Sequence, residues 1–159
     1  MARTVGTVFT PDVAAELNFT MVPIFGGAGA DCEESDTIEA CALDATGCIG
    51  GCTAESAHLL ASFVGCFEKN FSEGSTPPCF PKDATRCAFE VGLSAGIDRC
   101  LKSPERQKVA ADWIAAAAAA ADPKFFPTVL IDGEMDSDKA QNATQLQEAL
   151  CAAGVSAAC

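Results

Sequence analysis

The chain is acidic and long enough for one domain. Its 159 residues include 10 Lys+Arg and 22 Asp+Glu, which give a net charge of −12 at pH 7. A single domain over residues 1–159 can bury a real core. An acidic surface repels phosphate groups, so we expect no nucleic-acid partner. The longest apolar run, at 115–121, is too short to cross a bilayer, so we expect no membrane span.

Two elements are predicted before the first cysteine. Residues 7–17 suit a helix because their apolar side chains can share one face, although Pro11 delays its start. The apolar run at 19–25 predicts a strand that ends in a glycine-rich loop. That loop lacks the lysine of a phosphate-binding loop and no helix follows it promptly, so we interpret it as a plain connection.

From residue 32 to residue 122 the pattern becomes helical. We predict helices at 36–44, with Asp36 as the N-cap, at 54–70, at 84–91 and from the Ser103-Pro104 pair to residue 121. The second of these has the clearest apolar stripe, formed by Leu59, Leu60, Phe63, Val64 and Phe67. This block, at about 32–122, is therefore predicted to be a helical insertion between two strands.

The stretch at 125–133, Phe-Phe-Pro-Thr-Val-Leu-Ile-Asp-Gly, organises the rest of the chain. Residues 128–131 predict a buried strand that begins after a proline and turns at Asp132-Gly133 into a short edge strand. A last helix follows near 143–153, ends at Gly154, and buries Leu146, Leu150 and Ala153.

An aromatic residue, a proline and a threonine before such a strand are similar to the cis-proline loop of thioredoxin-like folds. The alternative is an ordinary trans proline at a strand edge. Together with the order of elements, the motif predicts an α/β fold. It would be a thioredoxin-like core, incomplete because its first strand is missing, with a large disulfide-stapled helical insertion. In that fold the loop residues Phe126, Pro127 and Thr128 would hold the substrate chain.

Ten cysteines indicate an oxidising compartment. The sequons at Asn18, Asn70 and Asn142 agree with a glycosylated protein that is lumenal or secreted. There is no CxxC, the only histidine is His58, and the acidic residues at 33–36 lack the spacing of a cation loop, so we expect no metal and no cofactor. We predict structural disulfides among Cys32, Cys41, Cys66, Cys79, Cys87, Cys100 and Cys151.

The segment Cys48-Ile49-Gly50-Gly51-Cys52 comes closest to a redox pair. Its two glycines make the spacing flexible, it could sit at the start of a helix, and His58 could act as a base. The alternative is a purely structural pair, which is the usual role of vicinal cysteines in lumenal proteins.

As an ordered set, several segments resemble the gamma-interferon-inducible lysosomal thiol reductase family. The set comprises Asn-Phe-Thr-Met-Val-Pro at 18–23, Glu39-Ala40-Cys41, Cys66, the later cysteines 79, 87 and 100, the Pro127 strand and Cys151. The resemblance implies a lysosomal or secreted enzyme that reduces disulfide-bonded protein substrates. In such enzymes a thiolate attacks the substrate disulfide, and a second cysteine resolves the mixed disulfide.

The sequence departs from the family in two places. The family's Cys-Gln-His-Gly…Glu-Cys signature is reduced to Asp31-Cys32-Glu33, and residues 1–6 contain no cysteine where the catalytic CxxC belongs. We therefore expect a chain that lacks the N-terminal CxxC segment and a signal peptide, with weak reductase activity as printed. The alternatives are a redox-silent thioredoxin-like module that binds peptides, and a secreted saposin-like helical disulfide scaffold with a lipid-binding face.

Overall fold

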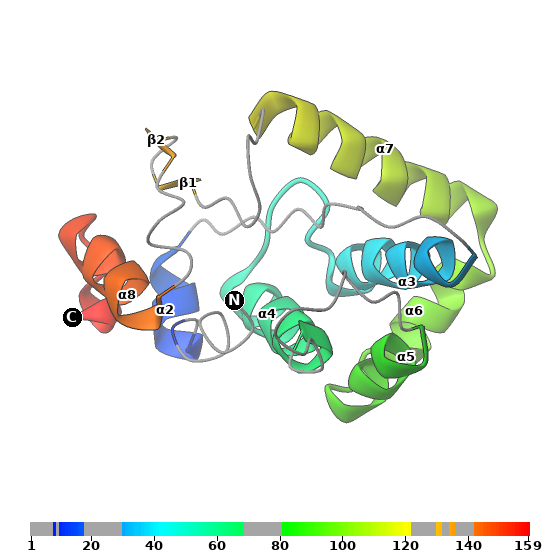
Figure 1. Cartoon of the computed structure of the whole chain (residues 1–159), viewed down its shortest axis with the longest axis horizontal. Coiled ribbons are helices and arrows are strands. Elements are labelled where there is room, and N and C mark those ends of the chain that lie inside the picture. The colour runs from blue at the N-terminus through cyan, green and yellow to red at the C-terminus, as the bar shows by residue number, and fades with distance from the viewer. Residues whose placement is uncertain are drawn as a thin grey trace.

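The computed structural model describes residues 8, 10–17, 30–68, 81–121, 130–131, 134–135 and 142–159. Within these residues the chain is mostly helical (Figure 1). The elements are α2 (Pro11–Glu16), α3 (Ala30–Thr46), α4 (Ala54–Glu68), α5 (Pro81–Glu90), α6 (Ser94–Leu101), α7 (Pro104–Ala121), β1 (Leu130–Ile131), β2 (Glu134–Met135), α8 (Ala143–Ala152) and the 3₁₀ helix η2 (Ser156–Ala158).

Helix α3 is the centre of the larger core, because α4, α5, α6 and α7 all pack against it. Figure 1 shows α7 along one side of α3 and the short helices α5 and α6 at one end. We call this core the central cluster. Its largest fully buried side chains include Phe63 and Leu43. At the edge, the Arg106 guanidinium of α7 lies 2.9 Å from the Asp44 carboxylate of α3.

Helices α3 and α6 run antiparallel at unusually close range. A disulfide joins Cys41 to Cys100, and one turn further along α3 the small residue Ala45 faces Gly96. A Cβ atom built on Gly96 would lie 2.6 Å from the Cβ of Ala45, which is too close for two carbon atoms. The missing side chain of Gly96 therefore allows the two helices to approach each other.

Three helices end in the same hydrogen-bonded motif, with a glycine one or two positions after the last helical residue and an apolar residue directly after the glycine. At the end of α3, Gly47 has φ +71°, its N–H donates to Asp44 O, and the N–H of Cys48 donates to Leu43 O over 3.0 Å. This is the Schellman arrangement, in which the residue after glycine packs back onto the helix. It buries Cys48 completely, and α5 and α8 bury Leu93 and Val155 in the same way.

A second core, the terminal cluster, joins the two ends of the chain. Apolar residues in or next to α2, α8 and η2 form it, namely Val8, Val13, Leu146, Leu150, Val155 and Ala158. Thr10 caps α2 through its hydroxyl, and Pro11 occupies the first turn as expected. The Glu16 carboxylate accepts hydrogen bonds from the Ser156 hydroxyl over 2.7 Å and from the backbone N–H groups of Ser156 and Ala157. One exposed carboxylate thus links residues 140 positions apart.

The prediction of an α/β fold with a thioredoxin-like core is wrong for the described residues. Their two cores are built almost wholly from helical side chains, so helix packs on helix. The described strands are two residues each and form one antiparallel pair. A sheet needs at least three strands with an apolar face to form a stable layer. The strand expected at 19–25 and residues 128–129 lie outside the described residues.

Several local predictions are confirmed. Leu130 pairs with Met135 and Ile131 with Glu134, so the predicted strand that ends at residue 131 is followed by the predicted short edge strand. The predicted turn at Asp132-Gly133 lies outside the described residues. The helices expected at 54–70, 104–121 and 143–153 are present, and Gly154 follows the last one with φ +95°. Ala153, however, is exposed, and Val155 is buried beside Leu146 and Leu150 instead.

Other predictions of helices need correction. Helix α3 begins at Ala30, so Asp36 lies inside it and is not its N-cap. Glu33 and Glu34 suit the first turns of a helix because negative side chains are stabilised near its positive N-terminal end. Helix α6 was not expected at all. The block at 32–122 is not an insertion into a sheet, because its helices themselves form the main core of the described chain.

Candidate thiol–disulfide site

The prediction of disulfide bonds is confirmed. The pairs are Cys41–Cys100, Cys48–Cys52, Cys66–Cys87 and Cys151–Cys159, and Cys32 is also disulfide-bonded. No cysteine in the described part of the chain is a free thiol. Cys79 lies outside that part.

The disulfides differ in how solvent reaches their sulfurs. Cys41 and Cys100 are both fully buried between α3 and α6. In the other two bonds of the central cluster one partner is fully buried, Cys48 or Cys87, while the other, Cys52 or Cys66, is partly exposed. Of these two asymmetric disulfides, Cys48–Cys52 lies just before the first residue of α4, and Cys66–Cys87 is attached to its last turn. Thiol exchange requires a reachable sulfur, and these two bonds combine one with a buried partner, so they are the candidates for chemistry. In Cys151–Cys159, by contrast, Cys151 is partly exposed and Cys159 is exposed, so neither partner is buried.

The bond between Cys48 and Cys52 is the pair that the sequence singled out. Cys48 is held by the end of α3, and the chain turns back through Gly50 and Gly51, both of which have positive φ. Thr53 then caps α4, since its hydroxyl accepts from the Ser56 N–H over 3.2 Å. Cys52 therefore directly precedes the N-cap of α4. The partial positive charge of a helix N-terminus stabilises a thiolate close to it.

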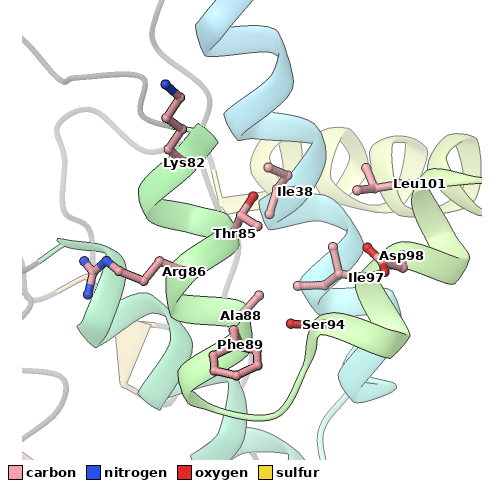
Figure 2. A pocket seen from close by; sticks show the side chains of 10 residues that line it. All are labelled: Ile38, Lys82, Thr85, Arg86, Ala88, Phe89, Ser94, Ile97, Asp98 and Leu101. Atoms are coloured by element: carbon pink, nitrogen blue, oxygen red, sulfur yellow. The ribbon is translucent and has the colours of Figure 1, made fainter.

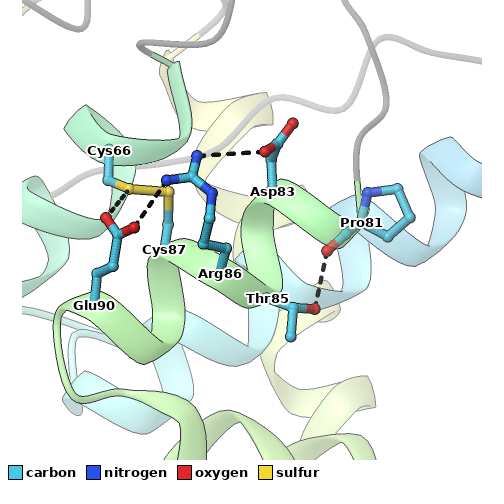
Figure 3. A network of polar contacts seen from close by, with 7 residues as sticks. All are labelled: Cys66, Pro81, Asp83, Thr85, Arg86, Cys87 and Glu90. Atoms are coloured by element: carbon cyan, nitrogen blue, oxygen red, sulfur yellow. Dashed lines mark hydrogen bonds and ion pairs between the residues drawn. A yellow bond between two sulfur atoms is a disulfide. The ribbon is translucent and has the colours of Figure 1, made fainter.

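The bond between Cys66 and Cys87 is surrounded by charged side chains (Figure 3). Glu90 places Oε2 at 3.3 Å from the Cys66 sulfur and Oε1 at 2.8 Å from Arg86 Nη1. Arg86 also reaches Asp83 over 3.3 Å, and its hydrogen bonds to Glu90 and Asp83 hold its pKa above the usual value. A disulfide sulfur has no proton, so its approach to Glu90 is a contact. It can become a hydrogen bond only after reduction.

The same cluster has the composition of a small metal site. The ligand atoms of Cys66, Cys87 and Glu90 all lie within 4.8 Å of one another. Zinc, however, binds cysteine as the thiolate, and these two sulfurs are bonded to each other. As it stands, the cluster is a disulfide with a neighbouring carboxylate.

The structure places one of the three sequons. Asn142 is exposed and is the N-cap of α8, with Oδ1 accepting from the N–H groups of Thr144 over 2.9 Å and Gln145 over 3.4 Å. The cap uses the side-chain oxygen, whereas a glycan is attached to the nitrogen. Asn18 and Asn70 lie outside the described residues, as do the predicted substrate-binding residues Phe126, Pro127 and Thr128.

Sequence reasoning missed a groove of about 520 Å³ between α5 and α6, with α3 beneath (Figure 2). The buried side chains of Ile38, Ala88 and Ile97 contribute to its lining. At its rim, Phe89 is 78% exposed and Leu101 is 38% exposed. The groove could not be predicted because α6, which forms one wall, was not predicted.

No helix in the described ranges has both the length and the apolar character needed to cross a membrane. Comparisons of the chain with protein-family models, with curated proteins and with solved structures found no match.

Proposed function

We propose that the chain is a thiol–disulfide oxidoreductase of an oxidising lumen, of the kind implied by its resemblance to the gamma-interferon-inducible lysosomal thiol reductase family. Within the described residues, we assign exchange to Cys48 and Cys52. One observation carries the assignment: the two are joined immediately before α4, with Cys48 buried and Cys52 partly exposed. A reachable sulfur backed by a buried partner suits attack at one cysteine and resolution by the other.

The reaction is a two-electron exchange. The Cys52 thiolate attacks one sulfur of a substrate disulfide and forms a mixed disulfide, while the other substrate sulfur is expelled as a thiolate, stays on the substrate and takes a proton. The Cys48 thiolate then attacks the Cys52 sulfur, so the substrate leaves as a dithiol and the Cys48–Cys52 bond re-forms. An external dithiol supplies the electrons for the next cycle.

Opening the Cys48–Cys52 bond should disturb the fold less than opening the buried Cys41–Cys100 bond. In the chain-entropy description, a bridge across 4 residues stabilises a protein by about 2 kcal/mol, and one across 59 residues by about 4 kcal/mol. The short bridge therefore contributes less to stability, which favours a role in exchange.

The compartment is part of the proposal. The disulfides agree with a secreted or lumenal protein. The sequons and the family resemblance make a lysosomal or secreted glycoprotein the more specific expectation. Deglycosylation should reduce the mass of the protein expressed in a secretory host, and Asn142→Gln should remove one of the glycans. An unchanged mass would contradict the proposed location.

The exchange assignment is tested by dithiol-driven reduction of a disulfide-bonded protein substrate. Turnover should be detectable, Cys52→Ser should abolish it, and Cys48→Ser should trap a mixed disulfide on Cys52. The matched control is Cys151→Ser with Cys159→Ser, which removes another short disulfide and should leave turnover unchanged. No turnover by the wild-type chain, or full turnover by Cys52→Ser, would contradict the assignment.

A second candidate function is a helical disulfide scaffold that binds lipid. The groove beside Phe89 favours it, because a large apolar side chain that is 78% exposed is available to an acyl chain. Co-sedimentation with uncharged lipid vesicles, reduced by Phe89→Ser, would support this function. Absence of binding would remove it.

A further inference from the structure

The Cys66–Cys87 disulfide can be attacked from one side only. Cys87 lies on α5 and is fully buried, whereas Cys66 lies on α4 and is partly exposed. An attacking thiolate must approach a disulfide sulfur in line with the bond and expel the other sulfur. Cys66 is therefore the sulfur that a partner thiol meets, and Cys87 is the leaving group.

The reachable sulfur lies beside a negative charge. Glu90 Oε2 is 3.3 Å from the Cys66 sulfur, and the Glu90 side chain is about half exposed. Asp83 adds a second carboxylate, and Arg86, which contacts both, supplies the one positive charge among these three residues. The group therefore carries one net negative charge, on a chain whose overall charge is −12.

A carboxylate in this position distinguishes thiols by their charge. The attacking thiolate is itself negative, and further negative charge on its carrier increases the repulsion, whereas positive charge offsets it. At an exposed surface these interactions are screened, so they change a rate by about two- to fivefold. That change is large enough to favour one class of partner over another.

We propose that Cys66 is a second thiol-exchange site, selective for thiols carried on cationic segments, and that Glu90 determines this selectivity. In the step, the partner's sulfur bonds to Cys66 Sγ and the Cys66–Cys87 bond breaks. Its electron pair passes to Cys87 Sγ, which takes a proton from water. The products are a mixed disulfide on Cys66 and a free Cys87 thiol, and attack by Cys87 on Cys66 reverses the step. The partner class is a polypeptide cysteine flanked by lysine or arginine.

The site is independent of the activity proposed for Cys48 and Cys52. Its test uses the full chain in the oxidised form and follows how fast the Cys66–Cys87 bond opens, by alkylation and mass mapping. The probes are three small thiols: cysteamine, which is cationic, 2-mercaptoethanol, which is neutral, and 3-mercaptopropionate, which is anionic. The reference is the disulfide bond of bis(2-hydroxyethyl) disulfide, a small uncharged molecule, because its rate of opening corrects for the different reactivities of the probes.

Relative to the reference bond, cysteamine should open Cys66–Cys87 about two- to fivefold faster than 3-mercaptopropionate does. Glu90→Gln should remove this preference, whereas Glu105→Gln, an exposed change of equal charge on α7, should keep it. In the unmodified protein, added salt should also reduce the preference, which gives a measurement that depends on no variant. The proposal is overturned if neither Glu90→Gln nor salt alters the preference, or if Cys66–Cys87 opens only together with Cys41–Cys100.

Discussion

The central and terminal clusters are held together by different means. In the central cluster, a buried disulfide spans 59 residues and joins two helices at close range. In the terminal cluster, the disulfide spans 8 residues within one end of the chain, and the two ends are joined by apolar packing and by the exposed carboxylate of Glu16. The central cluster should therefore depend most on covalent constraint and close helix packing, and the terminal cluster on apolar packing together with the charge of Glu16.

The two clusters should differ most in how much stability each loses when its disulfide is removed. Replacing Cys41 and Cys100 together by alanine should lower the free energy of unfolding by about 4 kcal/mol, because the unfolded chain gains the freedom of a long loop. The same change at Cys151 and Cys159 should cost about 2.5 kcal/mol. Urea unfolding of both variants measures this, and equal losses would contradict the contrast.

The packing of the central cluster is tested at Gly96. Gly96→Ala puts a carbon atom 2.6 Å from Ala45 Cβ, so α3 and α6 must separate. We expect a loss of about 1–3 kcal/mol, which is typical of overpacking, measured by the same unfolding experiment. The combination Ala45→Gly with Gly96→Ala relieves the contact and should recover part of the loss. A neutral Gly96→Ala would show that the approach of the helices is not constrained.

One feature of the central cluster should reduce its stability. Ser35 in α3 is 2% exposed, and its hydroxyl has no hydrogen-bond partner among the described residues. A buried hydroxyl without a partner costs free energy, and alanine is the better helix former. Ser35→Ala should therefore raise the free energy of unfolding by about 1 kcal/mol, which shifts the midpoint of urea unfolding to a higher concentration. A destabilised variant would indicate that the hydroxyl makes a contact.

The smallest effect, and the one specific to the terminal cluster, concerns pH. The Ser156 hydroxyl and the backbone N–H groups of Ser156 and Ala157 lower the pKa of Glu16 below its usual 4.5. Because the folded-state pKa is depressed, the link is present above pH 4.5 and is lost as the pH falls through the lowered value. The protection of the amide protons of residues 156–158 against hydrogen exchange, taken relative to the intrinsic exchange rate at each pH, should therefore fall in acid, so that exchange is faster than in a chain that keeps the link. Glu16→Gln should show the faster exchange already at neutral pH.

Local sequence signals predicted much of the secondary structure. The Ser103-Pro104 start, the apolar stripe of 54–70 and the glycine after α8 each depend on neighbours in sequence, and all three were found. Helix α6 depends on distant contacts. It contains Gly96, a weak helix former, and it is tied to α3 by Ala45 and by the Cys41–Cys100 bond. Without a way to predict those contacts, the helix could not be expected.

The candidate sites also divide into one that depends on sequence neighbours and one that depends on distant contacts. The Cys48–Cys52 pair was visible in the sequence because its members are four residues apart. The contact between Glu90 and Cys66 joins residues 24 apart, and disulfide connectivity cannot be deduced from cysteine positions alone. The thioredoxin-like core was wrongly expected because a short apolar run fits a strand locally, whereas the main core of the described residues is formed by helices that pack on one another.

Limited reduction tests the central claim most directly, namely that the asymmetric disulfides beside α4 exchange while the buried one maintains the fold. The oxidised chain is treated with increasing dithiol, quenched with an alkylating reagent and mapped by mass spectrometry. We predict that Cys48–Cys52 and Cys66–Cys87 open while Cys41–Cys100 remains intact and the helical signal is retained. Opening of Cys41–Cys100 first, or of all three bonds in one step as the helices unfold, would contradict it.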